Sequence, residues 1–253
     1  MPIVPTVLLE RGSGAAEIES ARSGLHRWYR PAHYVAKPAL GSRGDGVERL
    51  AAGGDEGEWR KLERLLAERD MLLQPFLSSV TLDGELCLVF VDGELLHAVH
   101  KDPSGWGARD DAAAAAAEEA DDGGESPAAC ARHVSDAQLV RRVDPVPPAA
   151  LALAQRALHV AERRTGPIFL ARVDLLRGDD DGFVVSELEL GWPELFLRLE
   201  DGAAARVAAA LLRRIEAGDE ARPRKARRPA RRAQPCVGLP ADDEVEIRLE
   251  RLR

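Results

Sequence analysis

The stretch that decides the fold is residues 168–190, IFLARVDLLRGDDDGFVVSELEL. It contains two runs of mainly apolar and β-branched residues, 168–176 and 183–190, separated by a short acidic segment that ends in glycine. Runs of this composition, bounded by Gly and Asp, are typical of strands joined by a tight turn. The stretch is therefore predicted to form a β-hairpin.

Charged residues lie at alternate positions of this hairpin. Because successive side chains of a strand point to opposite faces, Arg172 and Asp174 share one face, and Glu187 and Glu189 share one face of the partner strand. The intervening apolar residues are Ala171, Val173, Leu175, Leu188 and Leu190. The hairpin is expected to have a core side and a carboxylate side.

The pairing register depends on the turn. A two-residue turn at residues 181–182 would place Asp174 opposite Glu189, whereas a slip to residues 180–181 would place Asp174 opposite Glu187. Either register brings three carboxylates and one guanidinium together on the same side of the hairpin.

Three carboxylates on one side of a sheet favour a cation. Like charges directly opposite each other destabilise a sheet by roughly 0.2–1 kcal/mol per pair. Mg²⁺ (or Mn²⁺) takes oxygen ligands and is typically shared with substrate phosphates, which would also employ Arg172. Asp174, Glu187 and Glu189 are therefore candidate metal ligands. The alternative interpretation is an ordinary hairpin with a solvated acidic face.

A second candidate site is the segment HYVAKPALGSRGDGV, residues 33–47. A strand over 33–38 delivers Lys37 to a glycine-rich loop whose backbone N–H groups can surround phosphate oxygens. The loop residues in question are Gly41, Ser42, Gly44 and Gly46. The spacing fits neither a P-loop nor a dinucleotide fingerprint, and a plain surface loop is the alternative.

A third candidate is the end of the apolar run MLLQPFL, residues 71–77. Pro75 has no N–H for a sheet and biases Gln74 to an extended conformation, so the strand is expected to stop there in a hinge. Such a hinge exposes backbone carbonyl and amide groups that can bind an adenine edge. The alternative is a simple strand end.

Other runs along the chain predict an α+β fold with antiparallel sheets. Further strands are expected at 6–10, 85–91 and 94–101, and helices at 57–69, 147–164 and 202–218. The dipeptides Asp83-Gly84 and Asp92-Gly93 are expected to be hairpin turns, because that pair accepts the positive φ of a type I′ turn.

Composition narrows the class of protein. Of 253 residues, 45% are apolar and 31% charged, enough for one large core or two lobes. No long uncharged apolar run occurs and the N-terminus reaches charge too early for a signal peptide, so a cytoplasmic protein is expected, with no membrane partner. Three distant cysteines supply neither a disulfide framework nor a CxxC metal site.

The charge is unevenly distributed. The net charge is -8, and residues 221–232 carry seven basic side chains, so the remainder carries -8 - 7 = -15. An acidic body argues against a folded nucleic-acid surface and suits carboxylates that hold divalent cations. Residues 110–125 are expected to be a surface insertion, and 218–253 a tail without regular structure. Binding of nucleic acid or an acidic partner by this tail is a third functional hypothesis.

Taken in order, these features resemble the ATP-grasp superfamily. The segments LLQPFLSSVTLDGELCLVFVDGELLHAVHK (72–101), ARVDLL (171–176) and ELELGWPELFL (187–197) look like the bacterial glutathione synthetase group and the cyclo-ligases of D-cycloserine biosynthesis. The resemblance covers about residues 2–216. It implies two α+β subdomains that hold ATP between antiparallel sheets.

On the nucleotide side, the resemblance implies that Lys37 binds the α and β phosphates beneath a lid formed by residues 41–46. Gln74, Phe76 and Leu77 would line the adenine site. Glu85 would lie near the nucleotide.

On the chemical side, the resemblance places Lys101 and Arg109 on phosphate or acyl phosphate, and Arg172 on the transferred phosphate. Mg²⁺ (or Mn²⁺) would be held by Asp174, Glu187 and Glu189, where many relatives have asparagine at the last position. The implied reaction activates a small-molecule carboxylate with ATP as an acyl phosphate, which an amine-type nucleophile attacks.

The resemblance also implies an organisation. Residues 1–76 would be the small subdomain, incomplete at its N-terminus, and 77–217 the C-terminal subdomain with the metal site. A substrate-binding N-terminal domain would be absent, so a missing domain or a partner chain would supply the substrate side. Two functions stay open: a carboxylate–amine ligase, and a Mg–ATP-binding remnant or regulatory module without turnover.

Overall fold

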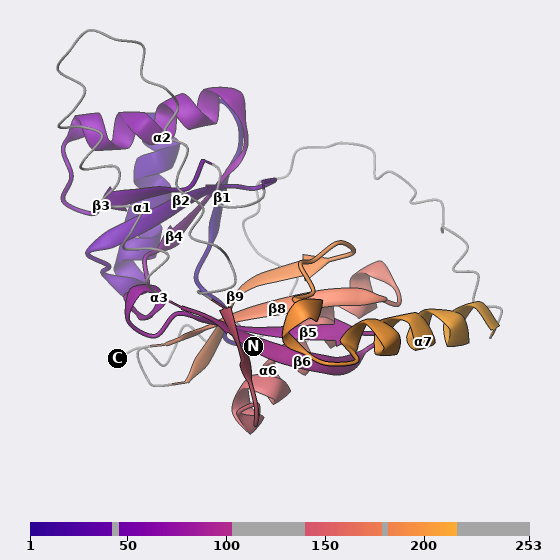
Figure 1. Cartoon of the computed structure of the whole chain (residues 1–253). Helices are drawn as coiled ribbons and strands as arrows, with labels where there is room; N and C mark the ends of the chain where they lie inside the picture. The colour runs from indigo at the N-terminus through magenta and orange to yellow at the C-terminus, as the bar shows by residue number, and fades with distance from the viewer. Residues whose placement is uncertain (42–45, 103–139, 179–181, 217–253) are drawn as a thin grey trace, which may run out of the picture.

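The computed structural model describes residues 1–41, 46–102, 140–178 and 182–216. These residues form a four-stranded and a five-stranded antiparallel sheet, each with helices packed against it (Figure 1). The predicted α+β class with antiparallel sheets is confirmed.

The first sheet has the strand order β1-β4-β2-β3 and carries two helices on one face. Its elements, called the first lobe below, are β1 (Val7–Leu9), α1 (Ala15–Tyr29), β2 (His33–Pro38), β3 (Glu48–Ala51), α2 (Glu56–Glu68) and β4 (Met71–Pro75). Alternate strand residues such as Tyr34, Ala36 and Leu73 are fully buried against Leu62 and Leu66 of α2. Side chains at the intervening positions point to the other face, on which no helix of the described residues packs (Figure 1).

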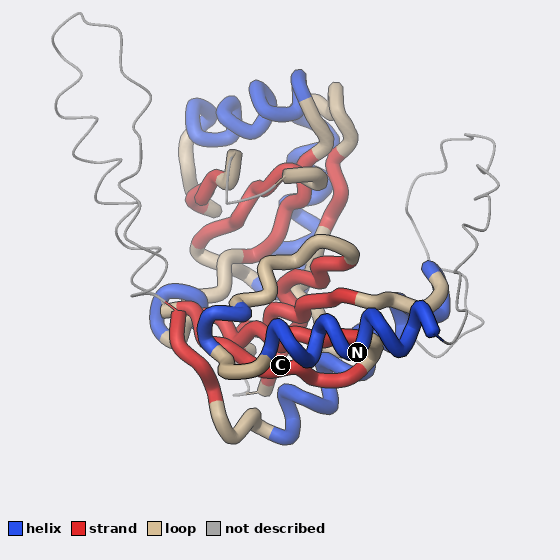
Figure 2. Tube along the Cα trace, turned by 45° about the vertical axis from the view of Figure 1, so that its right-hand side comes forward, coloured by secondary structure: helices blue, strands red, loops and turns tan. Residues whose placement is uncertain are grey.

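The helix-free face of the first sheet carries Lys37 and Gln74. The pairs Lys37↔Leu72 and Val35↔Gln74 place these side chains on the face opposite the buried core. In Figures 1 and 2, α2 lies on the outer side of the first sheet, away from the second sheet. The face with Lys37 and Gln74 is therefore the one turned toward the second sheet.

The second sheet has the order β7-β6-β5-β8-β9. Its strands are β5 (Glu85–Val91), β6 (Glu94–Lys101), β7 (Val140–Val143), β8 (Leu170–Arg177) and β9 (Phe183–Leu190). One face packs against α6 (Pro148–Thr165), with Leu88, Val173 and Leu175 fully buried. Figures 1 and 2 show α6 on the side of this sheet away from the first lobe, so the opposite face is turned toward the first lobe.

The face of the second sheet opposite α6 is apolar in one part and charged in the other. Phe196, the short helix η1 (Leu197–Leu199) and α7 (Ala203–Glu216) cover an apolar cluster that includes Val89 and Val99. Next to this cluster, the side chains of Arg172 and Asp174 lie on the same face, with the Arg172 guanidinium over the Phe196 ring. The charged part is where a site can form.

Two segments connect the lobes. After β4, the chain passes through Phe76 and Leu77 into the helical turn α3 (Ser79–Leu82). At the N-terminus, Val4 N donates to Val185 O of β9 at 3.0 Å, so residues before β1 lie along the second sheet. Buried Val4, Leu77, Val80 and Leu176 join the two connections in one small cluster.

The predicted turn at Asp92-Gly93 is confirmed, and the one at Asp83-Gly84 is wrong. Asp92 and Gly93 have φ of 51° and 80° and join β5 to β6. Asp83 instead ends α3, where its N–H and that of Gly84 both donate to Ser79 O, and Gly84 takes a φ of 78°. Here the Asp-Gly pair terminates a helical turn, a position that also favours a left-handed glycine.

The decisive hairpin forms with the slipped register. Asp174 lies opposite Glu187 and Arg172 opposite Glu189, and the ladder shifts by one residue between Asp174 and Leu175. The register with Asp174 opposite Glu189 is therefore wrong, because a β-bulge adds a residue that no turn count reveals. The turn itself, like the predicted segments 110–125 and 218–253, falls on residues outside the described part.

The remaining predicted elements agree closely with the structure, apart from small shifts of their ends. Strand β4 ends at Pro75 rather than Leu77, and β8 begins at Leu170 rather than Ile168. Helix α1 and strands β3 and β7 were not predicted. Among the described residues, no helix is both long enough and apolar enough to span a bilayer.

Candidate nucleotide and metal site

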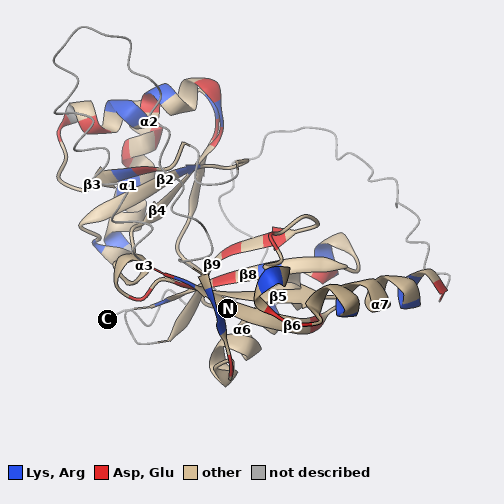
Figure 3. Cartoon of the chain, viewed as in Figure 1, with Lys and Arg blue, Asp and Glu red and all other residues tan. Residues whose placement is uncertain are grey.

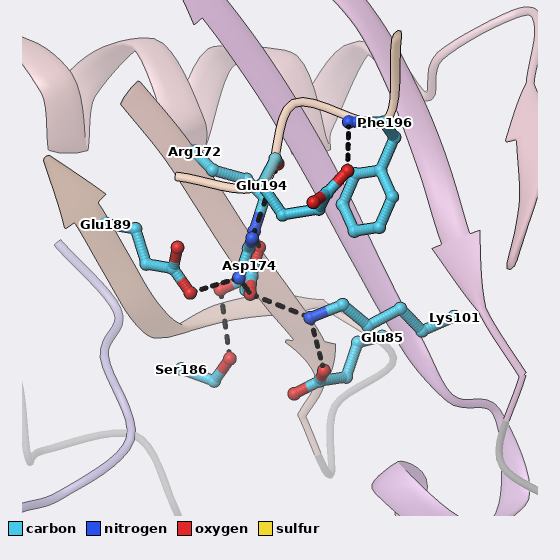
Figure 4. A network of polar contacts seen from close by, with 8 residues as sticks. All are labelled: Glu85, Lys101, Arg172, Asp174, Ser186, Glu189, Glu194 and Phe196. Carbon is cyan, nitrogen blue, oxygen red and sulfur yellow. Dashed lines mark hydrogen bonds and ion pairs between the residues drawn. The ribbon is translucent and has the colours of Figure 1, made fainter. Parts of the chain in front are cut away.

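Asp174 is the centre of a buried ion-pair network on the second sheet (Figure 4). Its side chain is 1% exposed. Arg172 Nε donates to Asp174 Oδ1 at 2.8 Å, and Arg172 Nη2 donates to Oδ2 at 2.9 Å. The two residues are two positions apart on β8, so the strand itself aligns a bidentate pair. The network therefore has a rigid core.

Arg172 also contacts groups outside β8. Its Nη2 donates to Glu189 Oε1, and its Nη1 lies 3.4 Å from Glu194 O. The guanidinium carbon is 5.6 Å from the centre of the Phe196 ring. Every nitrogen of Arg172 thus has a protein acceptor, and Phe196 shields this side of the network from α7.

Lys101 joins the network from the neighbouring strand β6. Its Nζ is 3.2 Å from both Glu85 Oε2 and Asp174 Oδ2. Strand β5 lies between β6 and β8, and the pairs Glu85↔Lys101 and Cys87↔Asp174 bring these residues together. Lys101, Glu85 and Asp174, which are far apart in sequence, are therefore neighbours through the sheet order.

The network changes the proton affinity of its members. Burial alone would raise the pKa of Asp174, but Lys101 and Arg172 outweigh it and hold that pKa below its usual value. Burial raises the pKa of Glu85, and it raises that of Glu189, with Asp174 adding to the effect. Burial opposes the charged form of Lys101, yet the Asp174 carboxylate keeps its pKa above the usual value. Asp174 and Lys101 are therefore charged at neutral pH.

Asp174 on β8 and Glu187 and Glu189 on β9 present oxygen atoms that all lie within 4.8 Å of one another. Figure 3 shows acidic positions in red on both of these strands. Glu187 is exposed and accepts no hydrogen bond from the described residues. Glu189 has one oxygen held by Arg172 and the other open. This is an all-oxygen donor set of the kind that suits Mg²⁺ or Mn²⁺.

The charges and contacts also fit a divalent cation. Four carboxylates (Glu85, Asp174, Glu187 and Glu189) and two cations (Lys101 and Arg172) give -4 + 2 = -2. Asp174 already accepts three bonds from these cations, so Lys101 and a metal ion would compete for its Oδ2. The open oxygens of Glu187 and Glu189 are the first ligands such an ion would meet.

The first lobe contributes sparser groups. The side chain of Lys37, partly buried on β2, has no ion pair or hydrogen bond with the described residues. In the adjoining loop, Gly41 and Gly46 are described. Gly46 has a φ of 72°, and a Cβ there would lie 3.1 Å from the Pro38 ring, so glycine suits this position. Ser42 and Gly44 lie outside the described residues.

The hinge residues are only partly accessible. Gln74 is 8% exposed and donates through Nε2 to Thr6 Oγ1. The Leu77 side chain is buried in the cluster between the lobes, so only its backbone remains for a ligand. The Phe76 ring is covered on one side by Arg49, whose guanidinium carbon is 4.0 Å from the ring centre.

The structure brings together six of the predicted site residues, namely Glu85, Lys101, Arg172, Asp174, Glu187 and Glu189, and it places Lys37 and Gln74 together on the facing sheet. Arg109 lies outside the described residues. Sequence reasoning missed Thr6, Ser186 and Glu194. Ser186 Oγ donates to Asp174 O at 3.1 Å, and Glu194 acts through its backbone carbonyl, which carries no residue-type signal.

A separate surface groove of about 330 Å³ lies between α1 and α2 and is lined by Ile18, Arg22 and Trp59 among others. It shares no residue with the charged network. The groove also contains carboxylates, among them Glu19 and Glu63, but among the described residues only the network brings three carboxylate oxygens within 4.8 Å of one another, which argues for the network as the site.

Comparison with known proteins identifies the fold. The chain is 32% identical over 217 residues to the cycloserine biosynthesis protein DcsG of Streptomyces lavendulae. It superposes on the crystal structure of D-cycloserine synthetase DcsG with a TM-score of 0.66 at 30% identity, over 85% of this chain. The chain belongs to the ATP-grasp superfamily. The ATP-grasp ligase PsnB, solved with a minimal precursor, Mg and ADP, has the same fold at 13% identity, with a TM-score of 0.50 over 84% of this chain and 53% of that one.

This ATP-grasp chain spans 66% of the length of the Streptomyces relative and 65% of the solved DcsG chain. No family model matches the sequence. The ATP-grasp fold therefore contains the network of Asp174, Arg172 and Lys101, and Lys37 lies on its facing sheet.

Proposed function

We propose that the chain binds Mg–ATP between the helix-free face of the first sheet and the charged part of the facing side of the second sheet, and serves a ligase that activates a carboxylate as an acyl phosphate. The observation that carries this is the pairing of two chemically complementary faces. Lys37 and Gln74 on one face suit phosphate and base, and the all-oxygen set of Asp174, Glu187 and Glu189 on the other suits a divalent cation.

Each residue has a distinct part in this proposal. Glu187, Glu189 and Asp174 would hold the cation, which when bound neutralises charge on the phosphate oxygens. Lys37 would pair with the phosphates as a point charge on a flexible stem. Lys101, held 3.2 Å from Asp174, would stabilise charge that develops on the transferred phosphoryl group. The relatives named cycloserine synthetase and ATP-grasp ligase support the reaction class.

A second candidate function is Mg–ATP binding without turnover. The contacts of Arg172 favour it, because all its nitrogens already have protein acceptors and none is left for a transferred phosphate. In this case Arg172 only orients Asp174 and Glu189. The carboxylate and amine substrates, and a partner chain, belong to the first function alone.

Two measurements test these proposals in order. Thermal-shift titration of the chain should show stabilisation by ATP with Mg²⁺ or Mn²⁺ and a smaller shift with ATP in excess EDTA. Equal shifts with and without the metal ion would refute the metal role. Release of ADP that depends on an added carboxylate and an added amine would then favour the ligase, and binding without such release would favour the module.

A further inference from the structure

The side-chain amide of Gln74 is held by a short hydrogen-bond relay. Gln74 Nε2 donates to Thr6 Oγ1 at 2.7 Å, and Thr6 Oγ1 donates to Val4 O at 2.8 Å. Thr6 precedes β1 by one residue, and the register Val7↔Leu73 places Thr6 directly opposite Gln74. The relay therefore follows from strand pairing across the edge of the first sheet.

The relay decides which end of the amide faces which way. A hydroxyl group carries one proton, and that of Thr6 is committed to the Val4 carbonyl. Thr6 Oγ1 consequently meets Gln74 only as an acceptor, which requires the NH₂ end of the amide. Gln74 Oε1 is turned away and accepts no hydrogen bond from the described residues, and although the residue is only 8% exposed, this oxygen is not among the fully buried unpaired atoms. An accessible acceptor in a mostly buried side chain is left for a ligand.

The anchor of the relay is itself fixed. Val4 is 4% exposed and packs with Leu77 and Leu176 in the cluster between the lobes. Its N–H donates to Val185 O on β9, two residues before Glu187. Because the Val4 side chain and N–H are both held, the Val4 carbonyl is a fixed acceptor for Thr6, and the exposed Thr6 can orient the mostly buried Gln74 amide.

We propose that Thr6 is a positioning residue for nucleobase selection. By holding Nε2 of Gln74, it presents Oε1 as an acceptor for the exocyclic 6-amino group of adenine. Guanine has a carbonyl oxygen at that position, so two acceptors would meet and a buried polar group would stay unpaired. This inference rests on the proposed function, because it assigns the base of the bound nucleotide.

The test compares Thr6→Val, which removes the hydroxyl at nearly constant volume, with Thr6→Ser, which keeps it. Calorimetric titration of the purified full chain with Mg–ATP and Mg–GTP gives the ratio of the two dissociation constants. Wild type and Thr6→Ser should both prefer ATP. In Thr6→Val, ATP affinity should fall about tenfold and the ATP-to-GTP preference should fall by a similar factor, since the freed amide can turn its NH₂ toward the guanine oxygen.

The preference ratio separates positioning from a structural role. Thr6 is exposed, so Thr6→Val should leave the thermal midpoint nearly unchanged. Wild-type binding of ATP together with an unchanged ratio in Thr6→Val would overturn the inference alone. So would a loss of preference in Thr6→Ser equal to that in Thr6→Val. Failure of the wild type to bind either nucleotide would refute the proposed function, and the inference with it.

Discussion

The two facing sheet surfaces differ in how their charged groups are held. On the second sheet, Arg172, Asp174 and Lys101 are tied to one another by ion pairs, with Arg172 and Asp174 almost fully buried. On the first sheet, Lys37 has no such partner among the described residues. The charged groups of the second sheet are therefore part of the folded core, whereas Lys37 on the first sheet would gain a charged partner only from a ligand. Substitutions among the charged groups of the second sheet should cost stability, and substitution of Lys37 only binding.

The largest expected effect is the loss of stability on removing Arg172. Arg172→Met leaves the buried Asp174 and the half-buried Glu189 short of a cation, which should lower the free energy of unfolding by about 3–5 kcal/mol. Chemical denaturation of the ligand-free chain measures this. The matched control is Arg213→Met on the exposed surface of α7, which should change stability by less than about 0.5 kcal/mol. Equal stability of the two variants would contradict the claim that the charged groups of the second sheet stabilise the fold.

Lys37→Ala should show the reverse pattern. Loss of a charged phosphate partner should weaken Mg–ATP binding by roughly 1.5–3 kcal/mol, or about 10- to 150-fold, without a comparable loss of stability. Calorimetry gives the affinity and denaturation the stability. Lys61→Ala on α2, whose side chain pairs only with Glu58, is the control with no expected change in affinity. An unchanged dissociation constant for Mg–ATP in Lys37→Ala would contradict phosphate binding by Lys37, and residues 41–46 would then be interpreted as a plain surface loop.

A smaller effect is expected at the metal ligands. Glu187 is exposed and unpaired among the described residues, so Glu187→Gln should preserve stability while changing the net charge of the network from -2 to -1. The affinity for Mn²⁺ in the presence of ATP, measured by electron paramagnetic resonance, should fall about tenfold. Glu94→Gln, an exposed glutamate at the start of β6, should bind as the wild type does. Equal Mn²⁺ binding by both variants would argue against the metal site.

The sequence predicts the arrangement of residues that are close together along the chain better than contacts between residues that are far apart. Alternation along a strand placed Arg172, Asp174, Glu187 and Glu189 on one side, because a period of two is visible locally. The pairing of Lys101 with Asp174 spans 73 residues and follows from the order β6-β5-β8, which no local pattern contains. Lys101 was expected at the site only through the family resemblance, as a ligand of phosphate or acyl phosphate, and its ion pair with Asp174 was not predicted.

Elements with weak periodicity were missed for physical reasons. Among the side chains of α1 that the structure describes, Ile18, Ala21 and Leu25 are the buried ones, and the helix contains Gly24, so its apolar stripe is narrow and its helix propensity low. Strand β7 is a four-residue run with two arginines, stabilised as a strand only by pairing with β6. Tertiary contacts therefore decide both elements.

The smallest expected effect is on pH dependence, and it separates two carboxylates of one network. The pKa of Glu189 is raised, so the native state binds its proton more tightly than the unfolded state, and ionised Glu189 destabilises the metal-free protein. In EDTA, Glu189→Gln should have the higher thermal midpoint near pH 8, and the difference should shrink as the pH falls toward about 5.

The lowered pKa of Asp174 predicts the opposite sign at lower pH. Its contribution to stability is present above the unfolded value of 3.8 and is lost only as the pH falls through the still lower native pKa. Calorimetric midpoints of wild type and Asp174→Asn should therefore differ by a nearly constant amount between about pH 5 and 8. A gap between these two proteins that closes within this range would contradict the assignment of charges.

The most direct test of the account is a crystal structure of the chain with Mn²⁺ and a non-hydrolysable ATP analogue, using anomalous scattering to locate the metal ion. The account predicts an anomalous peak among Asp174, Glu187 and Glu189, with phosphate oxygens shared between the ion and Lys37 and the adenine beside Gln74. A nucleotide bound elsewhere, or one bound in this place with no anomalous peak at the three carboxylates, would contradict it.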